Sequence, residues 1–283
     1  MQGASLSSAI DAAISAARSF GLTVEDAVVL HDSNRAAIRL LPCDVVARVA
    51  LGPHRAGMRF EAKVARELEA VNAPVAGLDP RCGAGVFEQG AFVVSFWTYF
   101  APQPEPLTPR EQAAALERLH EGFRAVQFPA PHFTDRVAEA RRIVHDPALS
   151  PALEAGDRQL LEDSLRKLTS LIQQRAVAEQ LLHGEPHPGN LLSTAVGPLF
   201  IDFETCCRGP VEFDIAHADD AVAMHYTGAD QELVALCSAL KLAMVAAWRW
   251  DKDDLFPDGI AMGIDFVRQL REAARVHNLA ALP

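Results

Sequence analysis

The sequence predicts an α+β protein of two lobes, with a small N-terminal lobe of β-sheet and helix and a larger, mainly helical C-terminal lobe. The chain has 283 residues, which is too long for one small hydrophobic core. Strand and helix patterns are mixed in the first hundred residues, whereas helical patterns dominate the remainder. Between these two parts, the segment APQPEP from Ala101 interrupts regular structure with three prolines.

The N-terminal lobe is expected to begin with a short amphipathic helix within residues 1–22. Two short strands follow, one from Val28 and one from Ala37, and the residues at 32–34 form the turn between them. A third strand covers residues 44–50. It carries Arg48, a single cation on an otherwise apolar strand, and such a cation needs a partner.

A helix is predicted from Met58 to Val71, because apolar residues recur there at spacings of four, four and three. An apolar, aromatic strand begins at Ala91. We place the linker near residues 97–105. The predicted domains are therefore residues 1–98 and residues 99–283.

The C-terminal lobe shows clear helix signals. Thr108 is a capping residue, Pro109 suits the first helical position, and Glu111 completes a capping box. A second helix is predicted over about residues 157–178, where leucines and one isoleucine gather on one side.

The most informative stretch is LLHGEPHPGNLL, followed by a turn and then by PLFIDFE. Prolines and a glycine prevent a regular helix in its first part, so the side chains there lie on a loop. Charged residues that end an apolar strand favour the rim of a site over the core. Phosphoryl transfer needs a carboxylate near the attacking hydroxyl and oxygen ligands for Mg²⁺, and this loop-and-hairpin pattern supplies both.

The stretch resembles the signature of aminoglycoside phosphotransferases and related small-molecule kinases, H-G-D-x-x-x-x-N followed by I-D-x-[DE]. A later segment, GPVEFDIAH, resembles the G-x-x-x-x-D-[LI]-A element of that family and supplies Asp214 as its acid. The positions that match the signature are His183, Gly184, Asn190, Ile201, Asp202 and Glu204.

The resemblance implies a protein-kinase-like fold and transfer of the γ-phosphoryl group of ATP, or GTP, to a hydroxyl of a small molecule. It implies that Asn190 and Asp202 bind Mg²⁺. Glu185 would orient or deprotonate the accepting hydroxyl, while His183 and Asp214 would brace the catalytic loop.

The resemblance also implies that residues 1–98 form a nucleotide-binding lobe and residues 99–283 a catalytic and substrate-binding lobe, and it implies a set of residues for the nucleotide. Arg48 occupies the place of the lysine that holds the phosphates, and Glu61 would be its helix partner. Ser33 and Asn34 lie in the turn that would cover the phosphates. Trp97, at the end of the strand, would contact adenine.

Two residues depart from the family pattern. Glu185 stands where aspartate is usual, and its extra methylene moves the carboxylate by about 1 Å, a displacement that can cost roughly 100-fold in rate. Arg48 replaces lysine; it keeps the charge and can grip a phosphate with two donors. The first departure leaves open a nucleotide-binding pseudokinase. A metal hydrolase that uses His183, Glu185 and His187 is a second alternative.

Composition bears on partners and compartment. The net charge of -11 argues against a nucleic-acid partner, and no run approaches the roughly 20 apolar residues of a membrane span. The five cysteines form no C-x-x-C pair, so reduced thiols in a cytoplasmic protein are expected, with Cys206 and Cys207 as packed thiols. A cationic acceptor is compatible with the acids that follow the motif, which equally suit solvated helices. These acids are Asp219, Asp220, Asp230 and Glu232.

Overall fold

The structure is a computed structural model that describes residues 3–32, 35–254 and 256–276. The chain divides into two compact units, each built from two separate stretches of sequence. The N-terminal unit combines Met1–Phe128 with Pro186–Cys206, and the C-terminal unit combines Pro129–Glu185 with Cys207–Pro283. The predicted functional ranges, 1–98 and 99–283, divide the chain differently and stay a prediction.

The N-terminal unit contains an antiparallel sheet of five strands in the order β1-β2-β3-β5-β4. The three strands predicted before residue 51 and the strand predicted from Ala91 are all present. The strands are β1 (Val24–Asp32), β2 (Ala36–Pro42), β3 (Val45–Leu51), β4 (Phe87–Gln89) and β5 (Phe92–Thr98).

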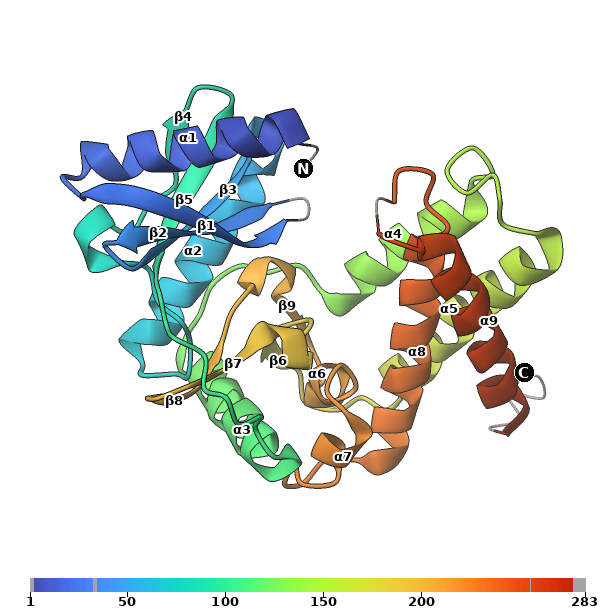
Figure 1. Cartoon of the computed structure of the whole chain (residues 1–283). Helices are drawn as coiled ribbons and strands as arrows, with labels where there is room; N and C mark the ends of the chain where they lie inside the picture. Colours follow the sequence, from blue (N-terminus) through green and yellow to red (C-terminus); the bar gives the residue numbers. More distant parts are fainter. Residues whose placement is uncertain (1–2, 33–34, 255, 277–283) are drawn as a thin grey trace. The chain divides into compact units, whose positions relative to one another are not determined.

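Each face of this sheet packs against a different helix. Val45, Ala47 and Val49 of β3 share a core cluster with the alanines of α1 (Gly3–Ser19), which runs along the sheet in Figure 1. The opposite face carries Ala50, which packs with Met58 of α2 (Arg55–Ala70). Because side chains alternate along a strand, Arg48 lies on the α2 face.

The second stretch of the N-terminal unit is a hairpin that joins residues distant in sequence. Its strands are β7 (Leu191–Thr194) and β8 (Gly197–Phe200). Phe200 forms a bridge with Val75, and Thr194 forms one with Pro102. The helix α3 (Pro109–Ala125) packs against β8 and begins with the predicted capping box. Short 3₁₀ helices complete the unit: η1 (Gly52–His54), η2 (Pro80–Cys82), η3 (Pro188–Asn190) and η4 (Phe203–Thr205).

The C-terminal unit is mainly helical, and α8 lies in its core against α4, α5, α6 and α9. Two short strands, β6 (Gln180–Leu182) and β9 (Cys207–Gly209), pair antiparallel. The helices are α4 (Phe133–His145), α5 (Ala155–Gln174), α6 (Val211–Ile215), α7 (Asp220–Ala223), α8 (Gln231–Arg249) and α9 (Gly259–Val276).

Among the described residues, α8 is the one helix whose length and apolar composition would suffice for a membrane span. The sequence analysis expected no such run, so α8 is an exception to that expectation. Nine of its residues are buried, and eight of these pack in the core of the C-terminal unit. A buried core helix passes the same test of length and composition, so this finding is weak evidence for a membrane span.

The predicted end of one helix was wrong. We expected a helix over about residues 157–178, but α5 ends at Gln174. Ala176 has a φ of 48°, a left-handed conformation that a helix cannot continue through. The leucine pattern that predicted the helix ends at Ile172, so the pattern placed the core face correctly and only the last turn incorrectly.

Four of the five cysteine side chains are buried, including Cys206 and Cys207. All five are free thiols. Burial raises the pKa of the Cys82 thiol to about 11 and shifts the pKa of Cys207 and Cys237 upward as well. These thiols therefore stay protonated and act as small apolar side chains.

Candidate active site

The first half of the motif is held in the C-terminal unit by one buried carboxylate. Asp214, on α6, accepts hydrogen bonds from the backbone N–H groups of His183 and Gly184, both at 2.8 Å. Asp214 and His183 are both fully buried. Gly184 has a φ of 90°, which favours glycine, so the loop turns sharply immediately after β6. Asp214 is thus placed to brace the loop, as the resemblance implied.

Glu185 follows directly and is anchored through both backbone and side chain. Its N–H donates to His183 Nδ1 at 3.3 Å, which assigns the imidazole proton to Nε2. Its carboxylate forms an ion pair with Arg136 of α4, and 27% of the Glu185 side chain is exposed. The candidate catalytic carboxylate is therefore fixed in position and accessible.

The second half of the motif belongs to the N-terminal unit, and η3 and the β7–β8 hairpin shape it. Asn190 ends η3, and its carbonyl accepts a hydrogen bond from the N–H of Ile201 at 3.0 Å. The hairpin thereby returns the chain beside Asn190, immediately before Asp202. Two residues separated by twelve positions are brought together by backbone pairing.

Asp202 has an unusual backbone and an unusual carboxylate. Its φ of 67° and ψ of 65° are left-handed, a conformation that costs roughly 1–3 kcal/mol outside glycine and clusters at functional sites. Its Oδ1 atom is buried and, among the described residues, accepts no hydrogen bond of good geometry. Arg48 Nη2 lies 3.2 Å from it, an ion-pair contact. This oxygen thus already faces one cationic group, and a carboxylate, with two oxygens, can also accept a metal ion.

Alternating charges extend from Asp202 across the α2 face of the sheet. Arg48 contacts Asp202 through Nη2 and Glu61 through Nη1. Glu61, 1% exposed, uses its second oxygen to bind Arg35 Nη1 at 2.9 Å. Arg35 in turn pairs with Glu204, two residues after Asp202. The series of contacts Asp202–Arg48–Glu61–Arg35–Glu204 therefore links the two acids of the I-D-F-E segment through β3, α2 and the residue that precedes β2.

The electrostatics of this network follow from burial. Burial raises the pKa of Glu61, while the neighbouring guanidinium groups of Arg48 and Arg35 oppose that shift. Burial acts to lower the pKa of Arg48, but Glu61 and Asp202 outweigh it and raise the pKa. Both arginines stay charged at neutral pH because guanidinium keeps its proton in proteins. Three carboxyl groups therefore face two guanidinium groups in this network.

The other residues predicted to contact the nucleotide are Ser33, Asn34 and Trp97. Ser33 and Asn34 lie outside the described residues. Trp97 is 6% exposed, and its indole N–H donates to Ser95 Oγ at 2.9 Å. Register places Ser95 opposite Arg48, so Trp97 and Arg48 share the α2 face. A side chain buried to this degree offers little surface to adenine, and the role of Trp97 stays a prediction.

His187 takes part in local loop structure. Its Nδ1 accepts a hydrogen bond from the N–H of Gly189 at 3.1 Å and caps η3. Across the described part of the chain, no three or more histidine, cysteine, aspartate or glutamate side chains gather as a metal site would require. The alternative of a metal hydrolase built on His183, Glu185 and His187 therefore has no support from the geometry.

Two residues escaped the sequence analysis. Arg35 immediately precedes β2, and β2 itself carries Arg39, so the single-cation signal that singled out Arg48 does not apply to Arg35. Arg136 lies in α4 among three further basic residues, within TDRVAEARRIVH, and no local pattern separates it from them.

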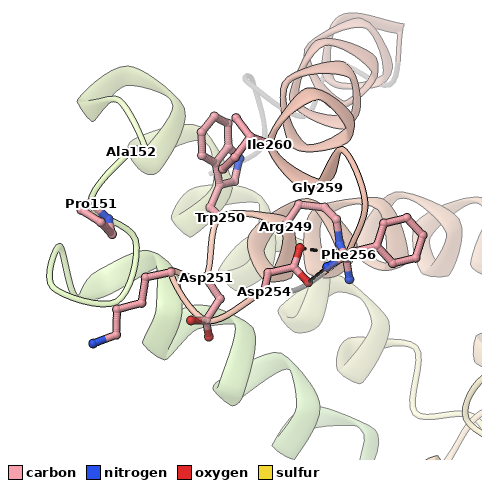
Figure 2. Close-up of a pocket in the computed structure, with 10 residues that line it drawn as sticks. Pro151, Ala152, Arg249, Trp250, Asp251, Asp254, Phe256, Gly259 and Ile260 are labelled. Carbon is pink, nitrogen blue, oxygen red and sulfur yellow. Dashed lines mark hydrogen bonds and ion pairs between the residues drawn. The ribbon is translucent and has the colours of Figure 1, made fainter. Parts of the chain in front are cut away.

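A hollow of the C-terminal unit lies where α8 ends and α9 begins (Figure 2). Arg249 Nη1 lies 3.0 Å from Asp254 Oδ2, and the guanidinium lies 4.5 Å from the ring centre of Phe256. Residues 183–185 do not line it. Arg249 and Asp254 are thus paired with each other, and the hollow contains none of the residues of the motif.

A family model described as the phosphotransferase enzyme family, APH, matches residues 26–250. A search of curated protein sequences found no significant match. The alternative of a pseudokinase gains no support from the comparisons.

Solved structures with the same fold include three small-molecule kinases. The GDP complex of wild-type aminoglycoside 2'-phosphotransferase-IIIa has a TM-score of 0.68 and 12% identity, covering 93% of this chain and 97% of that one. Choline kinase LicA from Streptococcus pneumoniae has a TM-score of 0.67 and 14% identity, covering 96% and 99%. Amicoumacin kinase hAmiN, in complex with AMP-PNP and Ca²⁺, has a TM-score of 0.66 and 13% identity, covering 87% and 88%.

These likenesses confirm the predicted α+β, protein-kinase-like fold. The family model covers 225 of the 283 residues, from the first strand of the sheet to the end of α8. The chain therefore belongs to the phosphotransferase enzyme family.

Proposed function

We propose that this protein transfers the γ-phosphoryl group of ATP, or of GTP, to a hydroxyl group of a small molecule. The observation that carries the proposal is the placement of Asn190 and Asp202 by one hairpin, with a buried Asp202 oxygen that accepts no hydrogen bond of good geometry. Mg²⁺ takes oxygen ligands and is bound by one or two protein side chains together with substrate phosphates. Asn190 and Asp202 would be those side chains.

In this reaction the hydroxyl oxygen of the acceptor forms a bond to the γ-phosphorus as the bond to the leaving nucleoside diphosphate breaks. The hydroxyl proton passes to Glu185 or to solvent. Bound Mg²⁺ would neutralise charge that develops on the phosphate oxygens. Because the transition state is loose, position and charge at Glu185 matter more than base strength. Arg48, fixed by Glu61, would hold the phosphates.

The relatives point to the class of acceptor. Their names describe kinases of an aminoglycoside, of choline and of amicoumacin, all small molecules. A small-molecule acceptor is therefore proposed here, and a cationic group on it is the first possibility to test. A location in the cytoplasm is likewise a proposal that fits the reduced, buried thiols.

The test is mass spectrometry of acceptor panels incubated with the protein and Mg-ATP or Mg-GTP. The panels span aminoglycosides, sugars and amino alcohols, and an acceptor-free incubation is the control. We expect one class to gain a phosphoryl group. Nucleotide that binds but is never consumed with any acceptor would count against the proposal and favour a binding protein.

A further inference from the structure

The candidate catalytic loop has a contact that the family signature does not include. Arg136 projects from α4, and 14% of its side chain is exposed. One nitrogen, Nη2, pairs with Glu185 Oε1, and the other, Nη1, donates to the carbonyl of Gly184 at 3.0 Å. Both ends of the guanidinium therefore hold consecutive residues of the loop.

The plane of the same guanidinium is also held. Its central carbon lies 5.0 Å from the centre of the Trp248 ring, on α8, which is within the range of a cation–π contact. Arginine can use its edge for oxygen acceptors and its face for an aromatic ring at the same time. Since α4 and α8 pack together in the core of the C-terminal unit, the guanidinium is attached to a rigid part of the molecule.

This arrangement fits the length of glutamate. A glutamate side chain has one more rotatable bond than aspartate, and fixing it costs conformational entropy. The ion pair with Arg136 restricts that freedom before an acceptor arrives. A carboxylate has two oxygens and about four acceptor positions, so the ion pair through Oε1 is compatible with a hydroxyl bound to the same group.

We infer that Arg136 is the positioning residue for Glu185, and that the pair makes this chain dependent on glutamate where its family usually has aspartate. The inference rests on the proposed function, because it assigns the accepting hydroxyl to Glu185. An aspartate at position 185 would withdraw the carboxylate from Arg136 by about 1 Å, a misplacement that can reduce the rate by roughly 100-fold. Restoring the usual family residue should therefore reduce activity here.

The test measures kcat and KM for the wild type, Arg136→Gln, Arg136→Lys and Glu185→Asp with Mg-nucleotide and an accepted substrate. The matched control is Arg141→Gln, because Arg141 also lies on α4 and pairs with a glutamate, Glu162, through Nε at 3.0 Å. We expect Arg136→Gln to lower kcat by about 10- to 100-fold with an unchanged KM for the nucleotide. The kcat of Arg136→Lys should lie between those of Arg136→Gln and the wild type, and the kcat of Arg141→Gln should equal that of the wild type.

A double-mutant cycle separates positioning from general support of the fold. If Arg136 acts through Glu185, Arg136→Gln should have little further effect in a Glu185→Gln background. Equal fold-losses in both backgrounds, or full kcat in Arg136→Gln or Glu185→Asp, would overturn the inference and leave the proposed function intact. A wild type without any transfer would overturn both. Should Arg136→Gln fail to fold, Arg136→Lys decides, and an unchanged kcat in it counts against the inference.

Discussion

At the scale of single residues, charge placement carries most of the chemistry. Asp202 has a left-handed backbone conformation, and its partly buried carboxylate lies next to Arg48. The carboxylate of Asp214 is buried and accepts hydrogen bonds from two backbone N–H groups. Asp202 follows three apolar residues, whereas Asp214 follows Glu212 and Phe213. Their structural roles differ because Asp202 lies at the end of a hairpin and Asp214 lies within the short helix α6.

His217 provides a residue-scale prediction about pH. Its ring is buried, its Nδ1 lies 2.8 Å from the carbonyl of Phe213, and burial lowers its pKa to about 4 from an ordinary 6.5. Between these pH values the unfolded chain binds a proton that the folded chain does not. Stability should therefore fall as pH drops from about 6.5 towards 4, by up to about 3 kcal/mol.

Urea unfolding of the wild type and His217→Gln at pH 7.5 and pH 5 checks this. The wild type should lose more free energy of unfolding on acidification than the variant does. Comparing the two proteins removes the contribution of carboxylates common to both. Identical losses would show that His217 does not titrate in this range.

At the scale of elements, apolar periodicity predicted most strands and helices, and capping chemistry predicted the start of α3. The pairing of charges could not be predicted in the same way. Arg35 and Arg136 find partners 26 and 49 residues away along the chain. No local pattern encodes such a distance, so these contacts needed the folded structure. The family resemblance supplied Glu61 as the partner of Arg48 where spacing alone could not.

The two residues of the α3 capping box should contribute to the free energy of unfolding in a coupled way. Thr108 Oγ1 accepts the N–H of Glu111 at 3.3 Å, and Glu111 accepts the N–H of Thr108 at 2.8 Å. Thr108→Ala should cost about 1 kcal/mol of stability. Denaturant unfolding of Thr108→Ala, Glu111→Ala and the double variant checks it. Both substitutions break the same reciprocal contact. The double variant should therefore lose less free energy of unfolding than the sum of the two single losses, and a loss equal to that sum would contradict a coupled capping box.

At the scale of the whole molecule, the sequence predicted two parts and the change from mixed to helical structure. It did not reveal that residues 186–206 belong with the N-terminal unit. That assignment depends on long-range contacts, such as the bridge between Val75 and Phe200, which leave no trace in the local sequence. The motif is consequently divided, with His183 and Glu185 in one unit and Asn190 and Asp202 in the other.

The placement of Asn190 and Asp202 as oxygen ligands of a nucleotide-bound Mg²⁺ is most directly tested without any acceptor. Isothermal titration calorimetry would measure binding of a non-hydrolysable ATP analogue to the wild type and to Asp202→Ala, with and without Mg²⁺. Thermal melting would confirm that both proteins are folded. We predict that Mg²⁺ tightens binding to the wild type by at least about tenfold, or about 1.4 kcal/mol, and much less in the variant. Equal enhancement by Mg²⁺ in both proteins would contradict the role of Asp202 and with it the proposed site.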